Sequence, residues 1–376
     1  MQSSLSQSKV VLAHHWIASY RGGERVLEQM AAIFPDSEIL TLFQNDKIDV
    51  PGLNGRTIHT SPLQRIPAIN AYYRHLLPIH PWAIGQLRID EHVDLLLSSD
   101  ASLIKAVHAD KQTTHVCYCH SPPRYLWEMT ADYKASSRAA RIAFDRFAPW
   151  LRSYDYEAAQ RVTHFIANSH FVADRIARHY DRSAEVIYPP VDVERFRATP
   201  SRQPFSLIVS ELVHYKRIDI AVEAFNQLGR RLVIIGDGPE RKRLESMAKP
   251  NIEFLGRQPS GVLKLHYEAA SKFIFPGIED FGMTPVEAQA AGCPVIALRA
   301  GGALETVVDD QTGKFFDEQN SDALAETILE ADRIDFDPKA CAAQAAGFAT
   351  HHFCRRLHQY LSEVMTPPQP LSLMSA

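Results

Sequence analysis

The chain has 376 residues, 45% of them hydrophobic and 22% charged, with a formal net charge of −4. This length suits two domains of about 180 residues each, and the composition is typical of a globular protein. The negative balance argues against nucleic acid as the main partner, because binding a phosphate backbone requires a basic excess.

The cysteines and the N-terminus bear on the cellular compartment. The five cysteines are scattered without the paired spacing of a disulfide framework, which favours a reducing compartment. The first residues, MQSSLSQSKVVLAHHW, lack the basic and apolar regions of a signal peptide. No stretch approaches the roughly 18 consecutive apolar residues of a membrane span. We therefore expect a cytoplasmic protein.

In the first half of the chain, short apolar runs alternate with helical patterns. Residues 9–14 (KVVLAH) precede a Gly-Gly turn and the helical pattern ERVLEQMAAIF, and further strand candidates lie at 93–98, 115–119 and 163–167. Such alternation predicts parallel strands joined by crossover helices.

Near residues 186–200 a proline-rich polar stretch predicts a linker, after which the alternation restarts. Five strand-like runs follow: FSLIVSEL, RLVIIGDG, NIEFLG, SKFIFPG and PVIALRA. We predict an α/β protein with two Rossmann-like, doubly wound domains, at 1–190 and 201–345, facing a cleft. A helix at 346–365 is predicted to cross back to the first domain, and 366–376 to form a disordered tail.

The strongest motif is PGIEDFGMTPVEAQAAGCPVIALRAGG at 276–302. Glu279 follows a predicted strand, and Thr284, Pro285 and Glu287 have the spacing of a capping box that opens a helix. A purely structural role for Glu287 fits this local pattern equally well. The backbone N–H groups of Gly282, Met283 and Thr284 would lie at the helix N-terminus, where an anion such as a diphosphate is stabilised. Carboxylates flanking that anion suit vicinal hydroxyl groups.

The EDFGMTPVE segment and the AQAAGCPVIALRAGGALETV that follows resemble the signature of the family 4 retaining glycosyltransferases, which have the GT-B fold. The similarity extends from KVVLAHHW to about residue 320 and is greatest to bacterial enzymes that build O-antigen and exopolysaccharide from GDP-mannose. The resemblance implies that Glu279 contacts the donor sugar and Glu287 the ribose. It also places Phe281, Gly282, Met283 and Thr284 in the donor site.

Two further segments of the second half match the same family. In SLIVSELVHYKRID, Lys216 matches a lysine that binds the donor diphosphate, and Arg217 is a second candidate cation. Many relatives carry an arginine where this chain has Glu211, which removes one expected phosphate ligand. In GDGPERKRLE, Gly236 and Gly238 permit a tight turn, and the resemblance makes them a wall of the nucleotide pocket.

The first half supplies candidates from two loops. Gly22 and Gly23 begin a helix after the first strand, where paired glycines let a backbone approach a ligand. His120 ends the strand HVCYC before a proline pair, and the resemblance places a histidine near the reacting sugar there. On the same basis we predict an acceptor-side role for Arg124, Tyr125 and Trp127.

The predicted reaction is transfer of a hexose, mannose from GDP-mannose, to a glycan or polyprenyl-diphosphate-linked glycan acceptor. His120, Glu279 and Lys216 are the predicted catalytic residues. The nucleotide sugar is a co-substrate, and neither a cofactor nor a metal is expected, because no Asp-x-Asp follows an apolar strand and Cys117-x-Cys119-His120 lacks a second ligand pair. A nucleotide-sugar epimerase, a phosphorylase and an inactive nucleotide-sugar-binding assembly protein remain alternatives.

Contact with the cytoplasmic face of a membrane is a further possibility for two segments. Residues 62–82 and 134–162 mix arginines with aromatic residues, a composition that suits interfacial docking. A helix that covers a domain core has the same pattern, so this prediction stays open.

Overall fold

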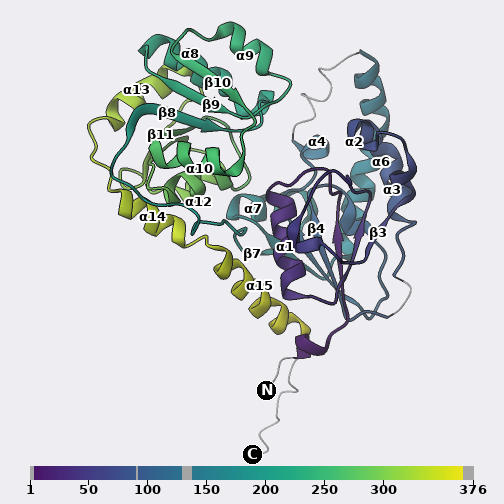
Figure 1. Ribbon diagram of the computed structural model, residues 1–376. Helices are drawn as coiled ribbons and strands as arrows, with labels where there is room; N and C mark the ends of the chain where they lie inside the picture. The colour runs from purple at the N-terminus through teal and green to yellow at the C-terminus, as the bar shows by residue number, and fades with distance from the viewer. Residues whose placement is uncertain (1–3, 90–91, 129–137, 367–376) are drawn as a thin grey trace, which may run out of the picture. The chain divides into compact units, whose positions relative to one another are not determined.

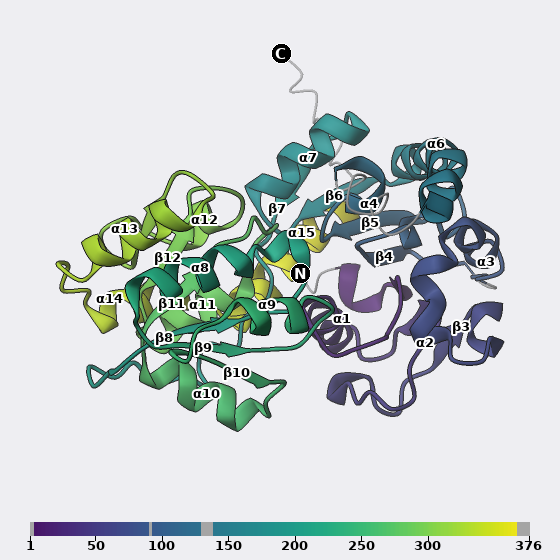
Figure 2. The same cartoon turned by 90° about the horizontal axis from the view of Figure 1, so that it is seen from above.

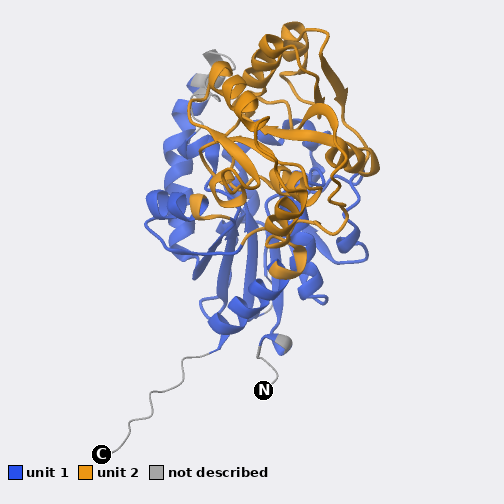
Figure 3. Cartoon of the chain, turned by 90° about the vertical axis from the view of Figure 1, so that its left-hand side faces the viewer, with its two compact units in different colours: residues 1–168, 172–187, 353–376 blue, residues 169–171, 188–352 orange. Residues whose placement is uncertain are grey.

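The computed structural model describes residues 4–89, 92–128 and 138–366, and its chain divides into two compact units. Unit 1 comprises residues 1–168, 172–187 and 353–376, and unit 2 comprises residues 169–171 and 188–352 (Figure 3). Apart from residues 169–171, the chain enters unit 2 at Tyr188, within the predicted linker, and returns to unit 1 at Phe353. The predicted tail lies outside the described residues, apart from Thr366.

Unit 1 contains a seven-stranded parallel sheet of order β3-β2-β1-β4-β5-β6-β7 (Figure 1). Its strands are β1 (Val10–His14), β2 (Glu38–Thr41), β3 (Ile58–Thr60), β4 (Leu95–Asp100), β5 (Thr114–Cys119), β6 (His164–Ala167) and β7 (Ala184–Val186). In the β1–β4 register, His14 is the partner of Ser99, so both residues lie at the carboxyl-terminal edge.

Helices cover both faces of this sheet. The helices are α1 (Gly22–Ile33), α2 (Ile69–Tyr72), α3 (His80–Ile84), α4 (Arg124–Trp127), α6 (Arg138–Arg161), α7 (His170–Tyr180) and α15 (Thr350–Met365). One core joins α1 and the Phe353, Leu357 and Leu361 side chains of α15 to the sheet. The opposite face packs against α2, α3, α6 and α7. Burial of these apolar faces is the main stabilising term for the unit.

Unit 2 contains a six-stranded parallel sheet of order β10-β9-β8-β11-β12-β13 (Figure 2). Its strands are β8 (Gln203–Val209), β9 (Leu232–Ile235), β10 (Ile252–Gly256), β11 (Ala270–Phe275), β12 (Val295–Leu298) and β13 (Gly313–Phe316). Alternate residues of these strands belong to two hydrophobic cores, one on each face of the sheet. The first core includes side chains of α8 (Ile218–Leu228), α9 (Arg241–Met247) and α13 (Ser321–Ala331). The other core includes α10 (Ser260–Ala269), α11 (Met283–Ala290), α12 (Ala303–Thr306) and α14 (Pro338–Ala346).

The strand orders confirm the predicted fold class, two doubly wound α/β units of Rossmann type. In each sheet the order reverses between two adjacent strands, β1 and β4 in unit 1 and β8 and β11 in unit 2. Ligands of such sheets bind outside the carboxyl ends of the strands at this reversal. Of the predicted site residues, Gly22 and Gly23 follow β1, Lys216 follows β8 and Glu279 follows β11, whereas His120 follows the neighbouring strand β5. Among the described helices, none combines the length and the apolar composition that a membrane span requires.

Candidate functional site

The carboxyl ends of β1, β4 and β5 bring together two histidines and a serine. His14 Nδ1 lies 3.0 Å from Ser99 Oγ, and the same oxygen lies 2.8 Å from His120 Nε2. The neighbouring His15 donates from Nδ1 to the Ser99 carbonyl oxygen at 3.2 Å. The predicted His120 therefore belongs to a cluster with His14 and Ser99, which lie at the carboxyl ends of β1 and β4.

Two histidines of this cluster are neutral at physiological pH. Burial lowers the pKa of His14 well below its usual value, and the neighbouring His15 and His120 lower it further. Burial also lowers the pKa of His15, although Asp100 partly opposes this change. Within the described part of the chain, His14 Nε2 is buried without a hydrogen-bond partner. Each of the two rings therefore carries a single proton on one of its nitrogens.

The start of α1 lies against these rings. A Cβ atom on Gly23 would be 3.5 Å from His14 Cε1 and 3.8 Å from His120 Nε2, so the backbone of Gly22 and Gly23 passes close to the cluster. Glu24 accepts a hydrogen bond from the backbone N–H of Arg21 at 3.0 Å, which stabilises this helix end. The N-terminus of α1 thus presents backbone N–H groups beside His14 and His120, an arrangement suited to an anionic ligand.

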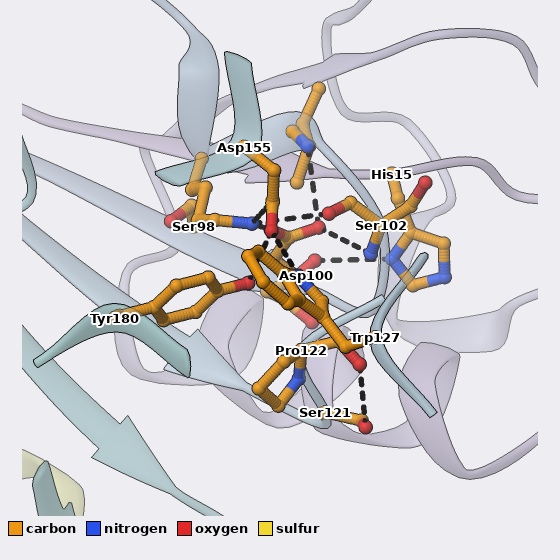
Figure 4. A network of polar contacts seen from close by, with 12 residues as sticks. His15, Ser98, Asp100, Ser102, Ser121, Pro122, Trp127, Asp155 and Tyr180 are labelled. Carbon is orange, nitrogen blue, oxygen red and sulfur yellow. Dashed lines mark hydrogen bonds and ion pairs between the residues drawn. The ribbon is translucent and has the colours of Figure 1, made fainter. Parts of the chain in front are cut away.

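A buried ionic network begins at Asp100, the residue after Ser99, and Figure 4 shows its polar contacts. Lys105 Nζ lies 3.0 Å from Asp100 Oδ2 and 2.5 Å from Asp155 Oδ1, and all three side chains are inaccessible to solvent. Burial alone would lower the pKa of Lys105, but Asp100 and Asp155 together raise it well above its usual value. Asp100 also accepts hydrogen bonds from the N–H groups of Ser102 and Ile104. The network therefore fixes the loop that follows Ser99.

The three predicted acceptor-side residues, Arg124, Tyr125 and Trp127, all lie on α4. Tyr125 is buried, and its hydroxyl group lies 2.9 Å from Ser102 Oγ. Trp127 donates to Asp155 Oδ2 at 2.8 Å and stacks on His179 with ring centroids 4.9 Å apart. Tyr125 and Trp127 thus use their polar groups inside unit 1, whereas Arg124 is half-buried. An acceptor-side role for the three residues stays a prediction.

In unit 2, the predicted catalytic lysine and glutamate are in direct contact. Lys216 lies in a short 3₁₀ turn after β8, Glu279 follows β11, and their side chains form an ion pair that is mostly shielded from solvent. Arg217 points to other partners, with its Nε 3.2 Å from Asp219 Oδ1 and its Nη1 3.3 Å from Gln319 Oε1. Lys216 is therefore the cation beside Glu279, and Arg217 holds the start of α8.

Glycines allow the segments around this ion pair to approach one another. A Cβ atom on Gly277 would lie 2.8 Å from the Lys216 carbonyl oxygen and 2.9 Å from its Cα. On the other side, Gly302 donates from its N–H to the Glu279 carbonyl oxygen at 2.9 Å. A Cβ atom there would lie 2.3 Å from Phe281 Cα. Any larger residue would force these backbones apart.

The helix after Glu279 begins earlier than predicted. Its N-cap is Gly282, with a φ of +83°, and α11 starts at Met283 without a side-chain cap. The predicted capping box of Thr284 and Glu287 is therefore wrong, because glycine in the left-handed conformation turns the chain into the helix one residue before Met283. Met283 and Thr284 still lie in the first turn, where N–H groups lack helical acceptors. Phe281 is buried, and its ring packs on Tyr188 and Phe348.

Glu287 lies within α11 and is largely buried. Its Oε2 accepts a hydrogen bond from the Tyr267 hydroxyl group at 3.0 Å, and 8% of the residue is exposed. The hydrogen bond from Tyr267 fixes the orientation of the Glu287 carboxylate. A carboxylate accepts several hydrogen bonds, and the predicted contact with the ribose would use another of its acceptor sites.

The turn after β9 packs against the loop after β8. A Cβ atom on Gly236, whose φ is +141°, would lie 1.8 Å from the Ser210 carbonyl oxygen, and one on Gly238 would lie 2.3 Å from that of Leu212. Both glycines are therefore required by backbone packing, whatever their predicted role in the nucleotide pocket.

A cavity of about 930 Å³ lies at the opposite, amino-terminal edge of the unit 1 sheet. Its lining includes Lys9, Glu38, His59, Arg88 and His358. Because it is remote from the carboxyl ends of the strands, we do not connect it with the predicted site. No cluster of three or more His, Cys, Asp or Glu residues suited to a metal ion occurs among the described residues.

His14, His15 and Ser99 lie in one cluster with the predicted His120, although no sequence motif pointed to them. His14 ends the first apolar run, KVVLAH, and His15 follows it, while Ser99 is the last residue but one of the run LLLSSD. The sequence feature that indicates these residues is their position as polar residues at the ends of predicted parallel strands. The carboxyl ends of such strands lie at one edge of the sheet, where ligands bind.

Comparison with known proteins gives two family matches. Residues 20–195 match the model of "Glycosyltransferase Family 4", and residues 192–345 match that of "Glycosyl transferases group 1". Together the two matches account for most of both units.

Curated relatives match over part of their length. A GDP-mannose-dependent alpha-(1-6)-phosphatidylinositol monomannoside mannosyltransferase of Mycobacterium tuberculosis is 32% identical over 211 residues, 48% of this chain and 54% of the relative. A GDP-mannose-dependent alpha-mannosyltransferase of Corynebacterium glutamicum is 31% identical over 173 residues, 44% of this chain and 41% of the relative. The chain thus spans about half the length of the curated relatives it matches.

Solved structures resemble the whole chain. The Anabaena protein HepE, crystallised with UDP, is 18% identical and aligns over 94% of this chain and 100% of its own, with a TM-score of 0.71. Sucrose-phosphate synthase from Thermosynechococcus elongatus is 17% identical, over 95% and 99% of the two chains, with a TM-score of 0.71. At sequence identities of 17–18%, the similarity shows a shared fold and nothing more.

Proposed function

The chain belongs to glycosyltransferase family 4, and from this premise we propose that it transfers a hexose from a nucleotide diphosphate sugar to a glycan or lipid-linked glycan. The observation that carries the proposal is the Lys216–Glu279 ion pair beside the N-terminus of α11. This edge of unit 2 combines a cation and free N–H groups for a diphosphate with a carboxylate for sugar hydroxyl groups.

We assign each donor group a partner from this edge. Lys216 and the N–H groups near Gly282, Met283 and Thr284 bind the diphosphate. Glu279 binds the transferred sugar, and Glu287 binds the ribose. Mannose from GDP-mannose is the donor we propose, supported by the printed names of the mycobacterial and corynebacterial relatives.

In the proposed reaction the acceptor oxygen bonds to the anomeric carbon on the face from which the diphosphate leaves, so the anomeric configuration is retained. The bond between the anomeric carbon and the diphosphate oxygen breaks, and the proton of the acceptor hydroxyl passes to the leaving diphosphate. Negative charge grows on the leaving diphosphate, where Lys216 and the helix N-terminus stabilise it. Such preorganised electrostatics is usually the largest catalytic contribution. His120 and Glu279 orient the sugar, and no side chain forms a covalent intermediate. The chemistry assigned to these groups requires no metal.

A membrane-bound acceptor would suit the exposed apolar side chains of unit 1. Tyr72, Ile79 and Trp82 are exposed around α2 and α3, and Ile142, Phe147 and Trp150 are exposed on α6. Together with Arg146 they have the composition of an interfacial surface. We propose that these segments contact the cytoplasmic face of a membrane. Residues 134–137 and the side chains of Arg138 and Arg141 lie outside the described part of the chain.

A thermal-shift panel tests the proposal. A ligand that binds the native state raises the unfolding temperature, and at a concentration of 100 Kd it adds about 2.7 kcal/mol. We expect GDP-mannose and GDP to raise it more than UDP-glucose, UDP-N-acetylglucosamine or UDP. No shift with any member of the panel would contradict a donor site. Product analysis then separates a transferase from an epimerase, which converts the donor without an acceptor, and from an inactive binding protein.

A further inference from the structure

Ser99 forms hydrogen bonds with three histidines at one edge of unit 1. Its hydroxyl oxygen lies 3.0 Å from His14 Nδ1 and 2.8 Å from His120 Nε2, while its carbonyl oxygen accepts from His15 Nδ1. A serine hydroxyl has one proton and two lone pairs. Among the described residues the Ser99 hydroxyl group forms hydrogen bonds only with the imidazoles of His14 and His120, so its buried proton is donated to one of them. The three-membered chain His14–Ser99–His120 therefore has a direction.

The burial of His14 decides that direction. His14 is neutral and completely buried, and its Nε2 has no partner among the described residues. Buried N–H groups without a partner are rarer than buried acceptors without one. The proton of His14 is therefore on Nδ1 and is donated to Ser99 Oγ. The hydroxyl proton of Ser99 then points to His120 Nε2, which must accept it.

We propose that Ser99 is a positioning residue that holds the His120 ring and fixes its neutral tautomer, with the proton on Nδ1. In this tautomer His120 presents a hydrogen-bond donor at Nδ1, whereas the opposite tautomer would present an acceptor there. The consequence for transfer rests on the proposed function, in which His120 orients the sugar. The tautomer itself is a property of the free protein.

The surroundings make this arrangement rigid. The backbone N–H of His120 donates to the Asp100 carbonyl oxygen at 2.7 Å, and Asn168 donates to the His120 carbonyl oxygen at 3.0 Å. The Asp100 side chain is held by Lys105 and by two backbone N–H groups. Ser99 thus lies in the paired part of β4, one residue before Asp100, whose side chain holds the following loop. A residue that selects one tautomer requires such a fixed position.

The adjacent serine provides a matched control. Ser98 is equally buried, lies on the same strand, and has its hydroxyl oxygen 2.9 Å from His115 Nε2. Ser98→Ala removes the same hydroxyl group as Ser99→Ala, together with a serine–histidine hydrogen bond of comparable length. Successive strand residues point to opposite faces, so this change leaves the His14–Ser99–His120 chain intact.

Nitrogen NMR of protein with ¹⁵N-labelled histidine tests the tautomer directly, with His120→Gln used to identify the His120 signals. We expect the Nδ1–H tautomer of His120 in the unmodified protein, in Ser98→Ala and in Ser99→Thr, which keeps the hydroxyl group. In Ser99→Ala we expect a mixture or the Nε2–H form. If Ser99→Ala does not fold, Ser99→Cys replaces it, because a thiol is a weak donor. An Nε2–H tautomer in the unmodified protein, or an unchanged tautomer in the alanine or cysteine variant, would overturn the proposal.

Kinetics then connect the tautomer with transfer. We expect Ser99→Ala to lower kcat by roughly tenfold to a hundredfold, because misplacement of an orienting group has effects of this size. KM for the donor should change less than kcat, Ser99→Thr should recover most of the rate, and Ser98→Ala should stay near the unmodified rate. Equal losses in Ser98→Ala and Ser99→Ala would contradict a specific role. Absence of transfer in every form, with the NMR result as expected, would refute the proposed function and leave the tautomer assignment standing.

Discussion

The ammonium group of Lys216 and the carboxylate of Glu279 form an ion pair, although the sequence motifs assign them to different parts of one ligand. In this pair each charge neutralises the other. A diphosphate that binds at this edge offers Lys216 a second and more highly charged partner. Donor binding and the ion pair are thus coupled, and changes at either residue should be visible in nucleotide affinity.

Removing the cation should weaken the binding of diphosphates specifically. In Lys216→Met we expect GDP affinity to fall by about 1.5–3 kcal/mol, roughly tenfold to a hundredfold, the usual value of hydrogen bonds to charged groups. Titration calorimetry with GDP and with guanosine measures this, and guanosine binding should change little. Lys272→Met is the control, because Lys272 also forms a partly buried ion pair in unit 2, with Asp332 at 2.6 Å. Equal affinity losses in both variants would argue against a role for Lys216 in phosphate binding.

Gly277→Ala should separate the segments that carry Lys216 and Glu279. The new Cβ atom would lie within 3 Å of the Lys216 backbone, so the loop must move and donor affinity must fall. Gly261→Ala on α10 is the matched control, since a Cβ atom there meets nothing within 4 Å. We expect the control to bind the donor normally and to be slightly more stable, because alanine favours helix. Normal donor binding by Gly277→Ala would show that the close approach is not required.

The ionic network of unit 1 should be costly to break. In Lys105→Met, two buried carboxylates lose their shared cation, and we expect a loss of about 3–5 kcal/mol in the free energy of unfolding. Urea denaturation followed by circular dichroism measures the change. Combining Lys105→Met with Asp100→Asn and Asp155→Asn removes the uncompensated charges and should recover part of the loss. A single variant as stable as the unmodified protein would contradict the burial of this network.

Buried histidines should make the protein less stable in mild acid. Burial lowers the pKa of His115 to about 3 and that of His80 to about 4. The unfolded chain, with histidine pKa values near about 6.5, binds more protons below that pH, so stability falls as the pH decreases from about 6.5 toward the folded-state values. For His115 the loss between pH 7 and 5 is about 2 kcal/mol. Urea denaturation at both pH values should show this loss reduced in His115→Gln and retained when the exposed His59 is replaced by glutamine. An unchanged pH dependence in His115→Gln would contradict this account.

The alternation of apolar runs and helical patterns was sufficient to predict the fold class. The strands β1, β4 and β5 and five of unit 2 are each marked by a run of several apolar residues. In contrast, β2 (EILT) and β13 (GKFF) were not predicted, because each has only two consecutive apolar residues, too few to show a strand pattern. Their positions follow from tertiary pairing with β1 and β12.

The candidate site was predictable where its residues are neighbours in the sequence. Glu279, Gly282 and Glu287 lie in one motif, although the helix start was misplaced because a left-handed glycine competes with a threonine cap. The contact of Lys216 with Glu279 and the cluster of His14, Ser99 and His120 join residues that are far apart in the chain. Only the strand order brings them together, and no local pattern encodes that order.

The most direct test of the central claim is release of GDP from GDP-mannose in the presence of a lipid-linked glycan extract, measured for the unmodified protein and for Glu279→Ala. We predict release with mannose incorporated into the extract by the unmodified protein, and none by Glu279→Ala at an unchanged unfolding temperature. Full activity of Glu279→Ala at the same unfolding temperature would contradict the account.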